Sequence, residues 1–348
     1  MGEQDPKMNE LKPIMDNRSD FDAVPLIDFG AMLDGGMRSK ASVAEEIRQA
    51  CTNVGFFYIA NHGVSLDLLA ATFAQIERLF AMSFEDKVKL HVKKSSHLLG
   101  YVGLRDENAN PLIGKGDLHE AFDFVADDAY SGADFLEGDP RKVGNQWPAN
   151  LPGFREVMTQ YSVAIRLLAR RLFSAFALAL DLPEAYFAPM SDKPMTLIRM
   201  LYYPSQPGPF NEAHLGTGAH TDHECFTVLC QDDVPALQVK NRRGEWIDAP
   251  RIPGTFVVNI GDLMARWTNG MFASTPHRVA NLSGRARYSL PAFFATNADA
   301  IIEALPTCVS ADNPPMYAPV VAGEYSSTLI YHHLNAHKEP HPLKNQPR

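Results

Sequence analysis

Short strand signals fill the stretch between Met195 and Ala298 and place the strongest limit on the fold. The segments are rich in β-branched and aromatic residues, and Gly, Pro, Asn and Asp separate them. They read LIRMLYY, CFTVLCQ, ALQVK, FVVNIG, HRVANL and YSLPAFFA. Many short strands joined by turns predict a sandwich, barrel or jelly roll rather than a parallel α/β sheet.

Helical signals precede this β-rich stretch. Apolar residues recur at helical spacing in SVAEEIRQACTNVG and in SLDLLAATFAQIERLFAMS, where Ser65 is a suitable N-cap. The longest helical signal begins at Gly153, and its wide apolar stripe is typical of a helix that packs along a sheet. A short strand is expected at 24–29. The predicted fold class is α+β, with a mainly β core flanked by helices.

The 348 residues divide by pattern into regions. In order they are a flexible N-terminal tail (1–23), an N-terminal region (24–150), a supporting long helix (151–194), the β-rich core (195–298) and a C-terminal extension (299–348). The N-terminal region becomes rich in loops and glycines after Lys93.

Charge and composition exclude several classes of partner. The net charge of −9 disfavours a general nucleic-acid or anionic-membrane surface, because both select a basic face. The four cysteines form no C-x-x-C pair and are read as free thiols in a reducing compartment. The chain shows neither a signal peptide nor an apolar run long enough to span a bilayer. We expect a cytoplasmic protein.

His220 and Asp222 lie within GAHTDHECFTVLCQDD, a run that otherwise reads like a buried strand. Charged and imidazole groups are costly to bury unless a partner balances them. On a strand, residues two apart face the same side, so both side chains would converge on one point. A divalent metal would balance the carboxylate and accept the imidazole lone pair.

His277 begins the segment HRVANL, another predicted strand, and supplies a third ligand. Two histidines and one carboxylate form the facial triad of non-haem Fe(II) oxygenases. A single His-x-Asp pair is weak evidence, because about one such pair is expected by chance in a chain of this composition. The third ligand and the residues that follow it strengthen the hypothesis.

Arg287 and Ser289 also stand two apart on a predicted strand. An arginine that points into an apolar strand cluster needs an anion, and its planar guanidinium binds carboxylates through two hydrogen bonds. A dicarboxylic acid whose other end lies on the metal would supply that anion. The alternative is a structural arginine paired with an acidic residue elsewhere in the chain.

These segments together resemble the Fe(II)/2-oxoglutarate-dependent dioxygenases of the isopenicillin N synthase-like superfamily. The resemblance rests on HTDHECFTVLCQDDVPALQV, GDLMARWTNGMFASTPHRV and RARYSLPAFF, with VPLIDF, ACTNVGFFYIANHGV, LFAMSFEDKVKL and NQWPANLPGFR in the N-terminal half. It covers roughly residues 24–298 in consistent order. It implies a double-stranded β-helix, or jelly roll, buttressed by helices.

The resemblance also implies roles for the candidate residues. The Fe(II) ligands would be His220, Asp222 and His277. Arg287 and Ser289 would bind the distal carboxylate of 2-oxoglutarate, and Tyr203 matches a tyrosine that reaches this cosubstrate. Leu201 departs from the family pattern, because many relatives have Asn there and one cosubstrate hydrogen bond would be missing.

The implied activity is the oxidation of a small molecule, in the first instance its hydroxylation. Dioxygen and 2-oxoglutarate would be consumed, succinate and CO2 released, and ascorbate would serve as a reductant. The expected partners are a small-molecule substrate, with no nucleic acid and no membrane. The protein would be a monomer or a homodimer.

Substrate contacts are predicted from position only. Arg199 shares strand parity with Tyr203 and is a candidate, although a structural arginine is an equal alternative. Arg105 and Asn108 lie in GYVGLRDENANPLIGKG, a Gly-flanked loop suited to act as a lid. The neighbours His223 and Phe293 are interpreted as structural.

Rival functions stay open at this point. An isopenicillin N synthase-like oxidase or cyclase would use no 2-oxoglutarate, and its Arg287 and Ser289 would bind the substrate's own carboxylate. An ethylene-forming enzyme would break 2-oxoglutarate itself. A non-catalytic jelly roll with structural zinc would need four protein ligands, whereas only three converge here. The sequence does not name the substrate.

Overall fold

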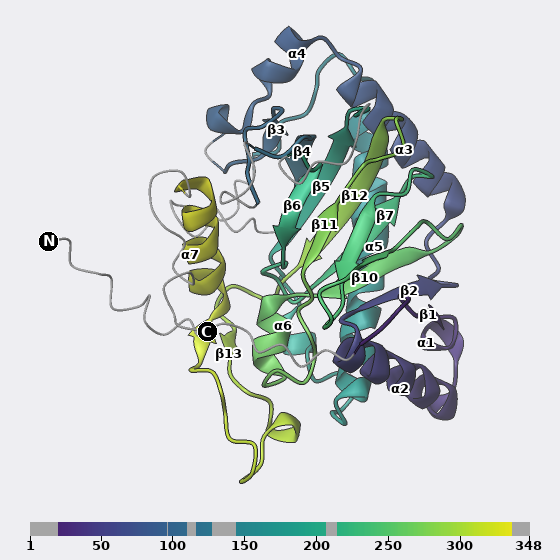
Figure 1. The fold of residues 1–348 in the computed structure, drawn as a ribbon, viewed down its shortest axis with the longest axis vertical. Helices are drawn as coiled ribbons and strands as arrows, with labels where there is room; N and C mark the ends of the chain where they lie inside the picture. Colours follow the sequence, from purple (N-terminus) through teal and green to yellow (C-terminus); the bar gives the residue numbers. More distant parts are fainter. Residues whose placement is uncertain (1–19, 96, 110–115, 127–143, 207–213, 336–348) are drawn as a thin grey trace, which may run out of the picture.

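The computed structural model describes residues 20–95, 97–109, 116–126, 144–206 and 214–335 (Figure 1). The N-terminal tail up to residue 19 and the last part of the C-terminal extension, from residue 336, lie outside the described residues.

An eight-stranded sheet forms the centre of the fold, in the order β1-β2-β10-β7-β12-β5-β4-β3. Its strands are β1 (Leu26–Asp28), β2 (Phe56–Ala60), β3 (Gly100–Val102), β4 (Glu120–Phe124), β5 (Thr196–Tyr203), β7 (Phe226–Gln231), β10 (Phe256–Ile260) and β12 (Arg287–Phe294). Neighbours are antiparallel, except that β1 runs parallel to β2. The N-terminal region and the β-rich core therefore share one sheet.

A four-stranded antiparallel sheet, in the order β6-β11-β8-β9, forms the second layer. Its strands are β6 (Thr217–His220), β8 (Leu237–Lys240), β9 (Trp246–Asp248) and β11 (His277–Val279). Side chains from both sheets line a common cavity. Two facing antiparallel sheets flanked by helices confirm the predicted jelly roll and the α+β class.

All of the strands predicted for the core are present, as β5, β7, β8, β10, β11 and β12. The short strand β9 was not predicted, and β6 was expected only as part of the run that carries His220 and Asp222. Strands β3 and β4, which lie in the stretch predicted to be rich in loops, were not predicted either. β3 is only three residues long, too short to show a periodic pattern.

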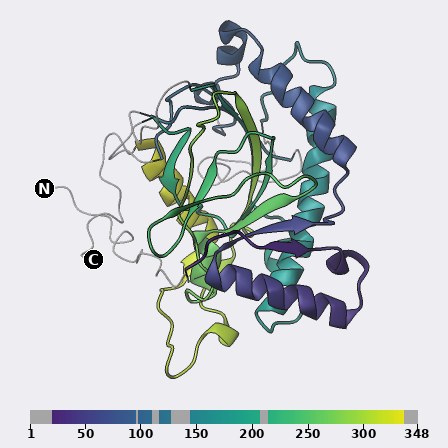
Figure 2. The ribbon, with the colours of Figure 1, turned by 45° about the vertical axis from the view of Figure 1, so that its right-hand side comes forward.

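Helices cover the outer face of the large sheet. They are α2 (Met37–Asn53), α3 (Leu66–Phe80) and α5 (Phe154–Ala179), and Figure 2 shows α3 and α5 side by side. Phe226 of β7 packs against α5, with ring centres 4.9 Å from Phe173 and 5.2 Å from Phe176. The predicted N-cap is confirmed, because the Ser65 side chain accepts a hydrogen bond from Leu68 N.

Shorter elements complete the described chain. They are α1 (Ala31–Asp34), α4 (Phe84–Lys89), α6 (Asp262–Trp267), α7 (Ala322–Asn335), the strands β13 (Ile301–Ile302) and β14 (Val320–Val321), and 3-10 turns at Val92–Lys94, Ala188–Met190 and Pro306–Cys308. In the described part of the chain, no helix has both the length and the apolar character needed to cross a membrane.

The segment after residue 298, predicted as an extension, packs against the core. The Arg266 guanidinium of α6 lies 5.5 Å from the ring centre of Tyr325 on α7 and donates a hydrogen bond to the Ala318 carbonyl. The adjacent residue of α7, Ser326, lines the cavity between the sheets. This segment therefore contributes to the wall of the candidate site.

Truncating Phe226 tests how much the contact between sheet and helix stabilises the fold. Phe226 is fully buried, so Phe226→Ala should lower the free energy of unfolding by about 3–5 kcal/mol, measured by urea denaturation. The matched control is Phe84→Ala, because Phe84 is 65% exposed and its loss should change stability by less than about 0.5 kcal/mol. Equal losses for the two variants would contradict the described packing.

Candidate active site

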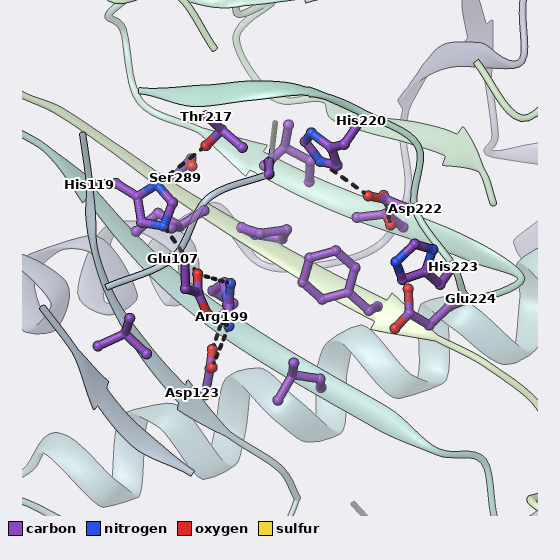
Figure 3. Close-up of a pocket in the computed structure, with 18 of the residues that line it drawn as sticks. Glu107, His119, Asp123, Arg199, Thr217, His220, Asp222, His223, Glu224 and Ser289 are labelled. Carbon is purple, nitrogen blue, oxygen red and sulfur yellow. Dashed lines mark hydrogen bonds and ion pairs between the residues drawn. The ribbon is translucent and has the colours of Figure 1, made fainter. Parts of the chain in front are cut away.

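A cavity of about 340 Å³ lies between the two sheets (Figure 3). Alternate residues of two neighbouring strands face it, as expected for the period of two in a strand. From β12 these are Arg287, Ser289, Pro291 and Phe293, and from β5 they are Leu197, Arg199, Leu201 and Tyr203. The cavity is therefore elongated along the strand direction.

The structure brings the three predicted metal ligands together. His220 ends β6 and lies opposite His277, the first residue of β11. The Oδ1 atom of Asp222 lies 3.5 Å from His220 Nε2 and 3.6 Å from His277 Nε2, and the candidate ligand atoms lie within 4.8 Å of one another. One detail of the prediction was wrong: Asp222 is not on a strand, because β6 ends at His220 and the carboxylate reaches in from the turn that follows.

Hydrogen bonds orient all three side chains. His220 Nδ1 donates to the Gly218 carbonyl at 2.8 Å, and His277 Nδ1 donates to the Thr275 carbonyl at 3.1 Å. Each Nδ1 is thereby committed to a backbone carbonyl, and each Nε2 faces the carboxylate.

The second carboxylate oxygen of Asp222 is fixed by hydrogen bonds from two buried side chains. Its Oδ2 accepts hydrogen bonds from Asn259 Nδ2 at 2.7 Å and from the Thr227 hydroxyl. Oδ1 remains directed toward the two imidazoles. The neighbouring backbone is fixed where Asp262 N donates to the Asp222 carbonyl at 2.8 Å. A Cβ at Gly261 would lie 2.2 Å from the Glu224 carbonyl oxygen, so only glycine permits this close approach.

The electrostatics of the triad match those of a cation site. Burial, with a smaller contribution from the charge of His220, lowers the pKa of His277 to about 4, so this imidazole is neutral. Burial would raise the pKa of Asp222, but the two histidines hold it well below its usual value. Metal ligands bind as neutral imidazole and ionised carboxylate. The two groups are therefore already in the protonation states that a divalent metal requires.

Arg287 is a buried guanidinium with unused donors. It is 1% exposed, lies 4.9 Å from the ring centre of Tyr203, and donates from Nη2 to Gln231 Oε1 at 3.0 Å. Its Nε and Nη1 atoms are buried and have no hydrogen-bond partner in the part of the chain that the structure describes. Leaving such donors unsatisfied is costly, so the site is built to receive an anion. Ser289, which is also buried, lines the same cavity.

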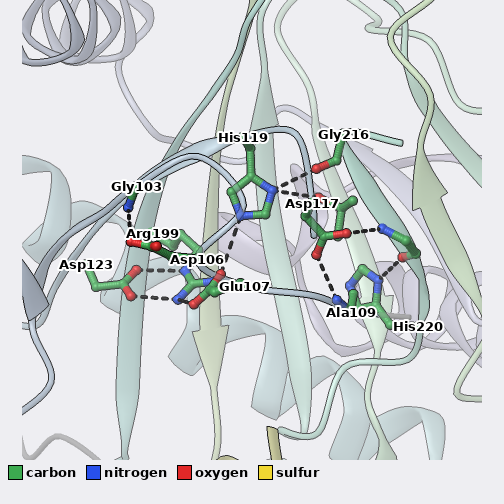
Figure 4. A network of polar contacts seen from close by, with 12 residues as sticks. Gly103, Asp106, Glu107, Ala109, Asp117, His119, Asp123, Arg199, Gly216 and His220 are labelled. Carbon is green, nitrogen blue, oxygen red and sulfur yellow. Dashed lines mark hydrogen bonds and ion pairs between the residues drawn. The ribbon is translucent and has the colours of Figure 1, made fainter. Parts of the chain in front are cut away.

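The predicted substrate residues have different surroundings. Arg199 lines the cavity, but its guanidinium is fully engaged (Figure 4). It binds Asp123 at 2.7 and 2.6 Å and Glu107 at 2.8 and 3.1 Å. Arg105 is exposed, and neither it nor Asn108 is among the described residues that line the cavity. From the same loop, Glu107 and Ala109 line it instead.

Hydrogen bonds connect the loop that carries Glu107 to β6, the strand that ends at His220. Asp117 accepts hydrogen bonds from Gly218 N at 2.9 Å and from Ala109 N at 2.8 Å. His119 lies 3.4 Å from Glu107, and its Nδ1 donates to the Gly216 carbonyl at 2.7 Å (Figure 4). Burial would lower the pKa of His119, but its hydrogen bond to Glu107 and the charge of that residue raise it.

Sequence reasoning missed several residues of the cavity wall. His223 was interpreted as pointing away, yet it lines the cavity with its Nδ1 3.5 Å from Asp262 Oδ2 (Figure 3). Phe293 was interpreted as core packing, yet it faces the cavity while Phe294 enters the core. Phe293 shares strand parity with Arg287, and this signal, which the interpretation as core packing overrode, was the correct one. The adjacent Glu224 was not considered at all.

The fold, the triad and the buried guanidinium define a non-haem Fe(II) oxygenase with an anionic cosubstrate. Residues 194–296 match the family model described as the 2OG-Fe(II) oxygenase superfamily, and residues 24–150 match the non-haem dioxygenase N-terminal model named for morphine synthesis. The chain belongs to the 2-oxoglutarate-Fe(II) oxygenase superfamily, within its isopenicillin N synthase-like group. The resemblance seen in the sequence is confirmed.

Curated relatives match nearly the whole chain. The 2-oxoglutarate-Fe(II) type oxidoreductase hxnY of Emericella nidulans is 35% identical over 331 residues, which cover 91% of this chain and 93% of the relative. A homoarginine-6-hydroxylase of Glycine max is 38% identical over 308 residues, which cover 83% of this chain and 90% of the relative.

Solved structures show the same fold with the cosubstrate bound. A full-length Neurospora crassa protein in complex with alpha-KG and thymine has a TM-score of 0.78 and 28% identity, with 90% of this chain and 97% of that chain covered. JOX2 in complex with 2OG, Fe and JA has a TM-score of 0.71 and 26% identity, with 97% and 94% covered.

The protein is therefore an enzyme, a dioxygenase that depends on Fe(II) and 2-oxoglutarate and acts on a small molecule. This function is favoured over the oxidase that uses no 2-oxoglutarate, the ethylene-forming enzyme and the non-catalytic metal module.

Removing Asp123 tests whether Arg199 is a buried charge that needs its carboxylates. The Asp123 side chain is 5% exposed, so Asp123→Ala should lower the free energy of unfolding by about 3–5 kcal/mol in urea denaturation. The matched control is Asp233→Ala, because the ion pair of Asp233 with Arg285 is exposed and contributes at most about 1 kcal/mol. A loss below about 1 kcal/mol for Asp123→Ala would show that Glu107 alone suffices to compensate Arg199.

Proposed function

We propose that this enzyme hydroxylates a small molecule in the cavity between the sheets, with Fe(II) held by His220, Asp222 and His277. One observation carries the proposal. The same cavity contains a convergent triad of metal ligands and a buried guanidinium, that of Arg287, whose Nε and Nη1 donors lack partners.

The ligand set fits Fe(II). Two imidazole nitrogens and one carboxylate oxygen are the donors of the facial triad, which leaves coordination positions for cosubstrate and dioxygen. A structural zinc site is usually closed by four protein ligands. Within the described residues, the group that converges here has three members, His220, Asp222 and His277. This donor set supports a catalytic metal.

The anion site fits the distal carboxylate of 2-oxoglutarate. Nε and Nη1 of Arg287 would donate to it, the Ser289 hydroxyl would add a third donor, and the Tyr203 ring supports the guanidinium. Charge-assisted hydrogen bonds of this kind are strong where water does not screen them. Arg287 thus determines where the cosubstrate lies relative to the triad.

When bound, Fe(II), 2-oxoglutarate and dioxygen supply the oxidising chemistry, which releases succinate and CO2 and leaves one oxygen atom on the substrate. The chain binds and orients the reactants and excludes water. Hydroxylation as the outcome is supported by relatives named homoarginine-6-hydroxylases. Ascorbate as a reductant, a monomeric or homodimeric state and a cytoplasmic location stay predictions.

Replacing Asp222 tests the metal assignment. Asp222→Ala removes the only carboxylate of the triad, so iron retained after dialysis should be lost and succinate release should fall by more than about 100-fold. The control is Asp312→Ala, which removes an exposed carboxylate and should leave both readouts unchanged. Full iron retention in Asp222→Ala would refute the ligand set.

Replacing Arg287 tests the anion site separately from the metal. Arg287→Ala should raise the Kd for 2-oxoglutarate by about 30-fold or more, because losing one partner of a buried charge pair costs about 2–5 kcal/mol. Iron binding should be unchanged. Arg285→Ala, which removes an exposed arginine two residues away, is the control. An unchanged Kd in Arg287→Ala would mean that the cosubstrate carboxylate binds elsewhere.

A further inference from the structure

The charges around the proposed iron and cosubstrate cancel once both are bound, so that part of the cavity is neutral. Fe(II) brings two positive charges and 2-oxoglutarate brings two negative charges. Asp222 and Arg287 contribute one charge of each sign. The remaining charged residues of the wall therefore determine which substrate charge the cavity accepts.

Glu224 places a further carboxylate in this remaining part of the cavity. Its side chain lines the cavity next to His223, and Figure 3 shows both beside Asp222. Across the described ranges, no ion pair and no hydrogen bond from another residue reaches the Glu224 carboxylate. The carboxylates of Glu107 and Asp123, in contrast, are bound by Arg199.

No arginine or lysine of the described wall is left to balance Glu224, and its basic neighbour His223 is shared with Asp262, whose Oδ2 lies 3.5 Å from His223 Nδ1. Arg287 and Arg199 are the only arginines or lysines among the described residues that line the cavity. Arg199 is shared between the carboxylates of Glu107 and Asp123, so it has no charge to spare for Glu224. Because all the hydrogen-bonding edges of Arg199 are taken, an anionic substrate would have to displace Glu107 or Asp123 to bind it.

The position of Glu224 is fixed by its backbone. Leu263 N donates to the Glu224 carbonyl at 3.2 Å, and Gly261 N donates to the Cys225 carbonyl at 2.9 Å. The side chain therefore starts from a hydrogen-bonded stretch of backbone two residues after Asp222. Apolar residues that continue β5 and β12 complete this end of the wall: Met195, Leu197, Phe293 and Ala295. They suit a hydrocarbon chain.

We propose that the substrate carries a positive charge, as a guanidinium or amine on an apolar chain, and that Glu224 binds this group. The proposal rests on the proposed function, because it places the substrate in the same cavity as iron and 2-oxoglutarate. An enclosed carboxylate is costly without a partner, and a cationic substrate supplies one. The ion pair would fix which carbon faces the triad.

The test compares two probes of nearly equal shape and different charge, hexylguanidinium and neutral hexylurea. Each is titrated by calorimetry, without oxygen, into the full-length enzyme loaded with Fe(II) and 2-oxoglutarate. Hexylguanidinium should bind at least about 10-fold more tightly than hexylurea. Equal affinities, tighter binding of hexylurea or no binding of hexylguanidinium would overturn the proposal.

Variants then locate the binding group. Glu224→Gln keeps the shape of the side chain and should lower the affinity for hexylguanidinium by about 10-fold or more, with hexylurea unchanged. Glu303→Gln, which removes an exposed carboxylate, should keep the full preference. A preference that persists in Glu224→Gln would overturn the role of Glu224, and the wild-type comparison decides the substrate charge if this variant fails to fold.

Titration of the same iron-loaded sample with 2-oxoglutarate distinguishes failure of the proposed function from failure of the cationic-substrate proposal. If 2-oxoglutarate does not bind, the proposed function fails. If it binds and the preference for hexylguanidinium is absent, only the cationic substrate is refuted.

Discussion

Burial of charge between two apolar sheets is the constraint on which the site depends. Asp222 and Arg287 are both buried, and Nε and Nη1 of Arg287 have no hydrogen-bond partner among the described residues. A protein keeps such groups only where bound ligands compensate their charge. The backbone carbonyls that orient the two histidines and the amide of Asn259 behind Asp222 serve the same end, because they direct every free ligand atom into the cavity.

The jelly roll places these groups on opposite walls. The histidines come from the small sheet and Arg287 from the large sheet, so under the proposed function iron and the far carboxylate of the cosubstrate would be held by different layers. The helices behind the large sheet keep the cavity closed on that side. The substrate would occupy the remaining part of the cavity, beside Glu224 and the cluster around Arg199. The charge of this remainder, rather than the fold, would then determine specificity.

Much of the site was predictable, because its residues stand close together in strands with clear patterns. The spacing of His220 and Asp222, and of Arg287 and Ser289, indicated convergence without any structure. The contacts of Arg199 were not predictable, since its partners lie 76 and 92 residues away and meet it only through the order of strands in the sheet. His223 was misplaced for a local reason: β6 ends at His220, so strand parity does not extend past it.

The central claim is that one cavity holds a metal triad and a cosubstrate anion at separate positions. A crystal structure of the protein with Fe(II) and 2-oxoglutarate tests it most directly. We predict metal density bounded by Nε2 of His220, Nε2 of His277 and Oδ1 of Asp222, with the distal carboxylate of 2-oxoglutarate on Nε and Nη1 of Arg287. Metal bound away from these three atoms, or a cosubstrate carboxylate that leaves Arg287 without a partner, would contradict the account.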